Sequence, residues 1–207
     1  MARPLTPRYF QLMVRDAQAG HRLSILAAVA ALLAATLVAS LALLASPRIE
    51  AATAASCANA EAPAQELQRK ALRKAMTCLI NKERKQRDLV KVSKNRQLKR
   101  AAQRHTNVMV KTDCLLHECP GEPGLEERIR RTGYLDGARR WAFAENTGCA
   151  VTAKAMIARW MDSDFHRGNI LRRKFRDLGV GVSDQPVSGQ CKETHATFTA
   201  VFARRKG

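Results

Sequence analysis

Three short stretches of the chain contain side chains that could do chemistry, each beside apolar or turn-forming residues. They are CLLHEC with His117, FAEN with Glu145 and SDFHRGNIL with His166. Two neutral imidazoles and a carboxylate can bind a divalent cation such as zinc, and they can also exchange protons as an acid–base set. Gaps of 28 and 21 residues separate them, so only a fold could bring them together. A surface or capping role for each histidine is the open alternative.

The elements that would position these residues begin with helices. Apolar residues recur at helical spacing in the ranges 65–87, 96–112 and 125–132, the last ending at Gly133 as a C-cap, and again from 152 to a break at DSDFH. His105 lies on the apolar stripe of the second helix. A histidine there is more often packed and bonded to nearby backbone than a ligand, so we expect a core role for it.

Strands are expected mainly after the helices. DLGVGVSD and ATFTAVFARR are rich in β-forming residues and predict two strands, and we expect two or three further short strands within 113–150. This order is not the alternation of strand and helix that builds a parallel sheet. It predicts an α+β domain with a central antiparallel sheet packed by helices.

The N-terminal region predicts export. Residues 23–47 carry no charge and are long enough to cross a bilayer as one helix. Residues 1–22 hold four arginines and one aspartate, so this short basic tail is expected in the cytoplasm and the rest outside it. The apolar run exceeds a usual signal peptide, which favours an uncleaved transmembrane signal anchor; cleavage and secretion is the alternative. An Ala-rich linker follows at 48–64, and the domain occupies 65–207.

The cysteines are consistent with an oxidising compartment. All six lie after the apolar run, and an even number in an exported domain indicates three disulfides, with 15 pairings open. The preferred pairs are Cys57–Cys78, which would tie the linker to the first helix, Cys114–Cys119 and Cys149–Cys191. For CLLHEC a metal site made by Cys114, His117 and Cys119 is the less favoured alternative.

Positive charge dominates the exported part. Of the net charge of +18, the first 22 residues contribute +3, which leaves +15 on the 160 residues from Arg48. Inside a cell this would indicate nucleic acid. Outside the cytoplasm we expect no nucleic acid; anionic envelope polymers or lipid head groups are the available partners, and a merely solubilising surface is the alternative.

The order of these motifs resembles a known family. CLINKERKQRDL, LLHECPGEPGLEERIRRTGY, AENTG, MIARWMDSDFHRGNIL, FRDLGVGV and TFTAVFA are similar to the CAP superfamily (cysteine-rich secretory proteins, antigen 5 and pathogenesis-related proteins), in its bacterial SCP-like branch. The resemblance covers about residues 76–203. It implies a three-layer α-β-α sandwich that agrees with the order of helices and strands.

The resemblance also implies a cavity lined by two histidines and two acids. His117, Glu145 and His166 match the two histidines and one acid, whereas Ser163 stands where eukaryotic relatives place the second acid. Asn146 would brace the loop of Glu145 through backbone hydrogen bonds. Trp160 is expected in the core.

The expected function is a binding module of the cell envelope without established catalysis. Its cavity would hold a divalent metal such as zinc or a small ligand, with no other cofactor, and the protein would be a monomer held to the membrane by its N-terminal helix. A metal-assisted, protease-like hydrolase is the alternative. We discount a Ser163–His166 nucleophile because no nucleophile elbow or oxyanion loop accompanies it.

Overall fold

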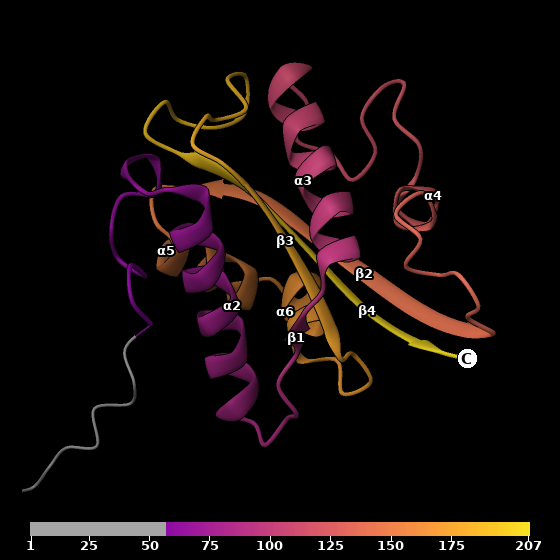
Figure 1. Cartoon of the computed structure of the whole chain (residues 1–207). Helices are drawn as coiled ribbons and strands as arrows, with labels where there is room; N and C mark the ends of the chain where they lie inside the picture. Colours follow the sequence, from indigo (N-terminus) through magenta and orange to yellow (C-terminus); the bar gives the residue numbers. More distant parts are fainter. Residues whose placement is uncertain (1–56) are drawn as a thin grey trace, which may run out of the picture. The chain divides into compact units, whose positions relative to one another are not determined.

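The computed structural model of the protein describes residues 57–207 (Figure 1). The predicted cytoplasmic tail, the apolar segment at 23–47 and most of the predicted linker lie outside the described residues. Within residues 57–207, no helix has both the length and the apolar character needed to cross a bilayer.

A four-stranded sheet runs through the domain in the order β1-β3-β4-β2. Its strands are β1 (Ser93–Lys94), β2 (Arg140–Ala150), β3 (Asp177–Ser183) and β4 (Ala196–Lys206). The three long strands are antiparallel, but the two-residue β1 pairs with β3 in parallel. The sheet is therefore mixed, and the prediction of a central antiparallel sheet holds for the three long strands but not for β1.

The interval 113–150 contains one long strand, so the prediction of two or three short ones is wrong. All eleven residues of β2 pair with β4, and FAENTGC lies inside this strand. Continuous pairing with the apolar β4 overrides the weak strand propensity of Glu145, Asn146 and Gly148.

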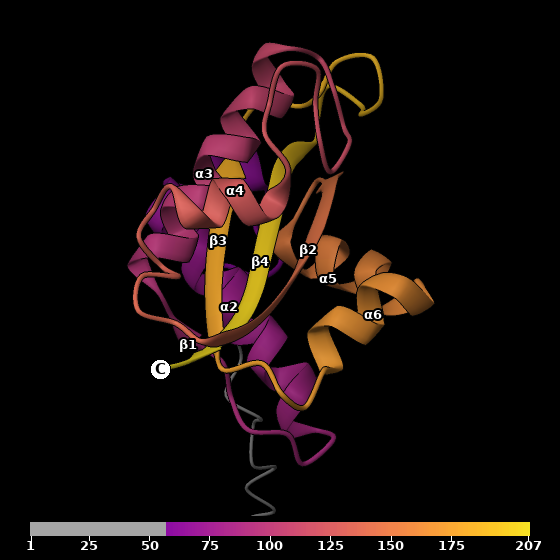
Figure 2. The ribbon, with the colours of Figure 1, turned by 90° about the vertical axis from the view of Figure 1, so that its right-hand side faces the viewer.

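Helices cover both faces of the sheet. Helices α3 (Arg96–Lys111) and α4 (Leu125–Arg130) lie on one face, and α5 (Ala153–Asp162) and α6 (Asp164–Leu171) lie on the other (Figure 2). Helix α2 (Arg69–Lys85), preceded by the 3₁₀ turn η1 (Ala64–Glu66), packs with α5 and α6. The α+β layers agree with the predicted sandwich.

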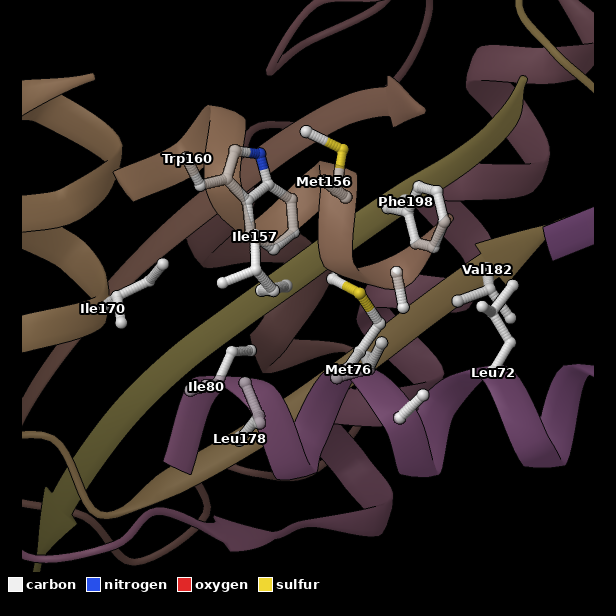
Figure 3. Close-up of a cluster of buried hydrophobic side chains, with 14 of the residues drawn as sticks. Leu72, Met76, Ile80, Met156, Ile157, Trp160, Ile170, Leu178, Val182 and Phe198 are labelled. Atoms are coloured by element: carbon white, nitrogen blue, oxygen red, sulfur yellow. The ribbon is translucent and has the colours of Figure 1, made fainter. Parts of the chain in front are cut away.

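The alternation of side chains along β4 separates two cores. Phe198, Ala200 and Phe202 pack in the core under α2, α5 and α6, whereas Val201 and Ala203 pack under α3 and α4. Figure 3 shows Phe198 in the first of these cores. Successive side chains of a strand point to opposite faces, so one apolar strand serves both layers.

Two glycines of β3 allow α3 to lie close to the sheet. A Cβ on Gly179 would stand 2.1 Å from the backbone of Leu98, and one on Gly181 would stand 2.4 Å from the carbonyl oxygen of Ala102. In the GVGV sequence the two valines pack into the core under α2, α5 and α6. The two glycines face the opposite layer, where the absence of a side chain lets α3 lie close to the strand.

The last residues of the predicted linker belong to the folded domain. Ala64 is fully buried and its amide donates to the carbonyl of Val151, while the carbonyl of Ala60 accepts from Lys154. Residues 57–64 are therefore fixed to the domain through Ala60 and the buried Cys57 and Ala64, whereas the side chains of Asn59 and Glu61 are exposed. The structure contains the three disulfides preferred from the sequence, Cys57–Cys78, Cys114–Cys119 and Cys149–Cys191.

Candidate functional site

Glu145 is the buried centre of the candidate site. It pairs with Val201 across β2 and β4, and the alternation of β2 directs its side chain to the face covered by α3 and α4. The residue is only 3% exposed. Arg128 of α4 donates from both terminal nitrogens, at 2.9 Å to Oε2 and 3.1 Å to Oε1. This bidentate pair neutralises the carboxylate inside the protein.

His117 is held against this carboxylate by the loop between α3 and α4. Its Nδ1 lies 3.1 Å from Glu145 Oε1, and its carbonyl oxygen accepts a bond of 2.7 Å from Arg128. The Cys114–Cys119 disulfide closes the chain on either side of it. An ionised carboxylate only accepts, so Nδ1 carries the proton and Nε2 is the free nitrogen of this ring. The side chain is 49% exposed.

A second histidine–carboxylate pair lies behind Glu145, and sequence reasoning missed it. His105 of α3 is fully buried, with Nδ1 2.6 Å from Glu122 and Nε2 3.7 Å from Glu145 Oε1. The prediction of a core histidine is correct, but its partner is a carboxylate rather than backbone. The sequence feature that could have indicated this pair is Glu122, an acidic residue in the Pro/Gly-rich loop before α4.

His166 approaches from the opposite layer. It lies in α6, with Nδ1 3.0 Å from Ser163 Oγ. Asn146, next to Glu145, points to this layer and donates to the carbonyl oxygen of His166 at 3.0 Å, while accepting from Asn169 at 2.9 Å. Asn146 therefore fastens α6 to β2; the loop it was expected to brace is a strand.

Phe165 lies near the exposed imidazole of His117 and the half-buried imidazole of His166. Its ring centroid lies 6.3 Å from that of His117 and 5.6 Å from that of His166, and Phe165 is 66% exposed. The structure thus brings His117, Glu145, Ser163 and His166 to one region at the β2 edge. Trp160 is buried in the core and donates to the carbonyl of Thr147, as expected for a packing residue.

The surroundings shift the pKa of two of these groups. Burial opposes ionisation of Glu145, but the hydrogen bonds from His117 and Arg128 and the nearby His105 outweigh it, so its pKa is lowered. Burial, and then the charge of His117, lower the pKa of His166. At neutral pH the site therefore presents a carboxylate and a neutral His166.

The three predicted metal ligands do not form a ready coordination site. Residues 57–207 hold no cluster of three or more His, Cys, Asp or Glu side chains arranged for a metal ion. Both oxygens of Glu145 are bonded by Arg128, and Oε1 also meets His117. The carboxylate fits the role of orienting His117 rather than binding metal, a common arrangement behind metal-binding histidines. His117 and His166 remain the candidate ligands.

Comparison with known proteins assigns the fold and the motifs to one family. The family model described as the cysteine-rich secretory protein family, CAP, matches residues 77–202, more than half of the chain. This chain belongs to the CAP family. A search of curated proteins found no match.

Solved structures agree with a CAP fold. An extracellular SCP-domain protein of Bacillus anthracis is similar at 22% identity and a TM-score of 0.52, over 67% of this chain and 44% of that one. An outer surface protein of Borrelia burgdorferi is similar at 15% identity and a TM-score of 0.56, over 68% of this chain and 97% of that one. These likenesses show the fold, and this CAP chain spans less than half of the Bacillus protein.

Proposed function

We propose that this CAP domain is a binding module outside the cytoplasm, and that His117 and His166 contact its ligand. The observation that carries the proposal is the support behind His117: a buried carboxylate, itself fixed by Arg128, holds the ring so that Nε2 is free. A domain that only needed stability would gain little by burying an ion pair, because desolvation offsets most of the attraction. Three disulfides agree with an oxidising compartment.

The ligand we propose is a divalent cation such as zinc, or a small molecule received between the imidazoles and Phe165. Two imidazoles supply fewer donors than the three or four protein ligands of ordinary zinc sites, so a metal here would bind modestly, with water or the small molecule completing its shell. Ser163 in place of an acid agrees with this weak site, because it positions His166 through Nδ1 and adds no charge.

Zinc titration by calorimetry at neutral pH tests this proposal. The protein is compared with a His117→Ala/His166→Ala double variant. The control is His195→Ala, which removes a histidine that is not part of the proposed site. One-site binding that is lost in the double variant and kept in His195→Ala supports the proposal. Absence of binding, or binding unchanged by the double variant, contradicts the metal site.

A metal-assisted hydrolase is the second candidate. An imidazole oriented by a carboxylate is the usual form of a general base, and His117 with Glu145 has that form. Turnover of a peptide substrate that needs added zinc and disappears in His117→Ala would favour the hydrolase. Zinc binding without turnover favours the binding module.

The proposal also concerns how the N-terminal region attaches the domain to the membrane. We propose that residues 23–47 anchor the domain in the membrane as a single span, with residues 65–207 outside the cytoplasm as a monomer; release by signal cleavage is the alternative. The length and lack of charge of that segment support the anchor. The mass of the mature N-terminus, measured on membrane and medium fractions, distinguishes the two.

A further inference from the structure

A groove between α2 and α3 is lined by an unusual number of positive charges. Its volume is about 520 Å³. One wall is a single face of α2, and the other is the end of β1 with the start of α3. Leu178 and Val180 of β3 also line the groove, and Figure 1 shows the course of β3 relative to the two helices. Its six cationic side chains are Lys70, Arg73, Lys74, Lys94, Arg96 and Lys99.

No acid neutralises these charges. The residues that line the groove include no Asp or Glu, and within residues 57–207 none of the six cations takes part in an ion pair. By contrast, Arg130 of α4 and Arg131, which caps this helix, each pair with a glutamate one turn away. The cations of the groove repel one another, and a bound anion would relieve this repulsion.

The shape of the groove favours a chain over a flat surface. Lys70, Arg73, Lys74 and Thr77 succeed one another along about two turns of α2, roughly 10 Å of helix axis. The apolar side chains of Leu178 and Val180 form part of its lining. A concave site with cations on both walls surrounds a linear polyanion, whereas a planar bilayer would meet only the outer rims.

The residue types favour phosphate among the anions. Four of the six cations are lysines, which bind phosphate as compact point charges, and the two arginines provide planar donors that also suit phosphate. Arg73 is partly fixed, since its guanidinium donates to Gln103 at 3.2 Å, and Gln103 in turn bonds the backbone of Val182.

We propose that this groove binds a linear phosphate-bearing polymer outside the cytoplasm. The site is separate from the histidine site: it lies at the β3 side of the sheet, and the histidines lie at the opposite edge, beside β2. Its test therefore does not depend on whether His117 and His166 bind a ligand.

The probe is inorganic polyphosphate, and its affinity is measured by calorimetry at several salt concentrations with the full chain in a non-ionic detergent. The groove variant is Lys70→Gln/Lys74→Gln/Lys99→Gln. The matched control, Lys85→Gln/Lys111→Gln/Lys174→Gln, removes the same charge from exposed lysines outside the groove. With six cations engaged, log Kd should change with log salt with a slope of about 4, using the single-strand coefficient of roughly 0.7 per contact.

The groove variant should lower the affinity at least tenfold and reduce the slope to about 2, and the control should leave both near the unaltered values. His117→Ala/His166→Ala should have no effect. Equal losses in the groove variant and the control would overturn the proposal, because net charge alone would then explain binding. Equal affinity for polyglutamate would overturn the phosphate preference, and binding to phosphatidylglycerol vesicles but not to polyphosphate would overturn the polymer.

Discussion

The buried pair of Glu145 and Arg128 should be strongly coupled in stability. Both residues are almost fully buried, and two hydrogen bonds of 2.9 and 3.1 Å join them. Glu145→Gln keeps an oxygen acceptor, and the guanidinium still donates to the carbonyl of His117. The carboxylate that remains beside it is the more distant Glu122, 3.7 Å from Nε. Breaking a buried pair by removing one partner costs about 3–5 kcal/mol.

Arg128→Met should cost a similar amount, because it leaves the carboxylate of Glu145 buried without its strongest donor. The double variant removes both charges together, so its loss should be close to that of one single variant rather than the sum. We expect a coupling free energy of about 3 kcal/mol between the two positions.

Urea unfolding at pH 7 with intact disulfides measures this cycle, provided that the m value stays constant. Glu127→Gln is the control: its pair with Arg131 is exposed, so the change should stay below about 1 kcal/mol. Additive losses in the double variant would refute the coupling.

The stabilisation that the Glu145–Arg128 pair provides should be lost at acidic pH. The pKa of Glu145 is lower in the folded protein than the ordinary value of a glutamate. Its stabilising contribution is therefore fully present above about pH 4.3 and is lost as the pH falls through the lower folded pKa. The difference in stability between the protein and Glu145→Gln should shrink only below about pH 4.

The remaining predictions concern packing and the second imidazole. Gly181→Ala should destabilise the domain by about 3 kcal/mol through overpacking against α3. Gly168→Ala has open space at its Cβ, so it should be neutral or should stabilise α6 by up to about 1 kcal/mol. Thermal unfolding compares the two variants, and equal effects would contradict the close approach of α3 to the sheet. In His117→Gln the pKa of His166 should rise toward the ordinary value, because the positive charge that His117 carries when it is protonated is lost. An NMR titration of the ring protons measures this pKa, and an unchanged pKa would mean that burial alone sets it. Because His166 is harder to protonate when folded, it lowers stability as the pH falls from about 6.5 to its folded pKa, and His166→Gln should remove that part of the pH dependence.

The sequence was sufficient for features that depend on local pattern. The apolar spacing located α2 and α3 to within a few residues, and Thr152 caps α5 by accepting from the amide of Ala155. The three preferred disulfides are those of the structure, although the sequence by itself leaves 15 pairings open. The same kind of pattern correctly placed His105 and Trp160 in the core.

Features that depend on contacts between distant parts of the chain could not be predicted from the sequence. Glu145 and Arg128 are 17 residues apart, and nothing local distinguishes Arg128 from the exposed arginines around it. Arg84 is likewise fully buried and donates to the carbonyls of Val90 and Ile170, although it lies in a run of charged residues that reads as solvated. Strand β1 has only two residues and exists because β3 offers an edge to pair with.

The Cys57–Cys78 disulfide determines how the domain would respond to mechanical tension. A pull on the chain before Cys57 would reach α2 directly through the sulfur bridge, because Cys78 lies within that helix. The two cysteines are 21 positions apart in the sequence. The 20 residues between them, about 70 Å of extended chain, are shielded from the load and cannot be drawn out while the bridge is intact. Under reducing conditions the same pull would instead act on residues 58–77 and would have to draw the buried Ala64 and Leu72 out of the core before the segment could extend. The redox state of this one disulfide therefore determines how far the attachment can extend.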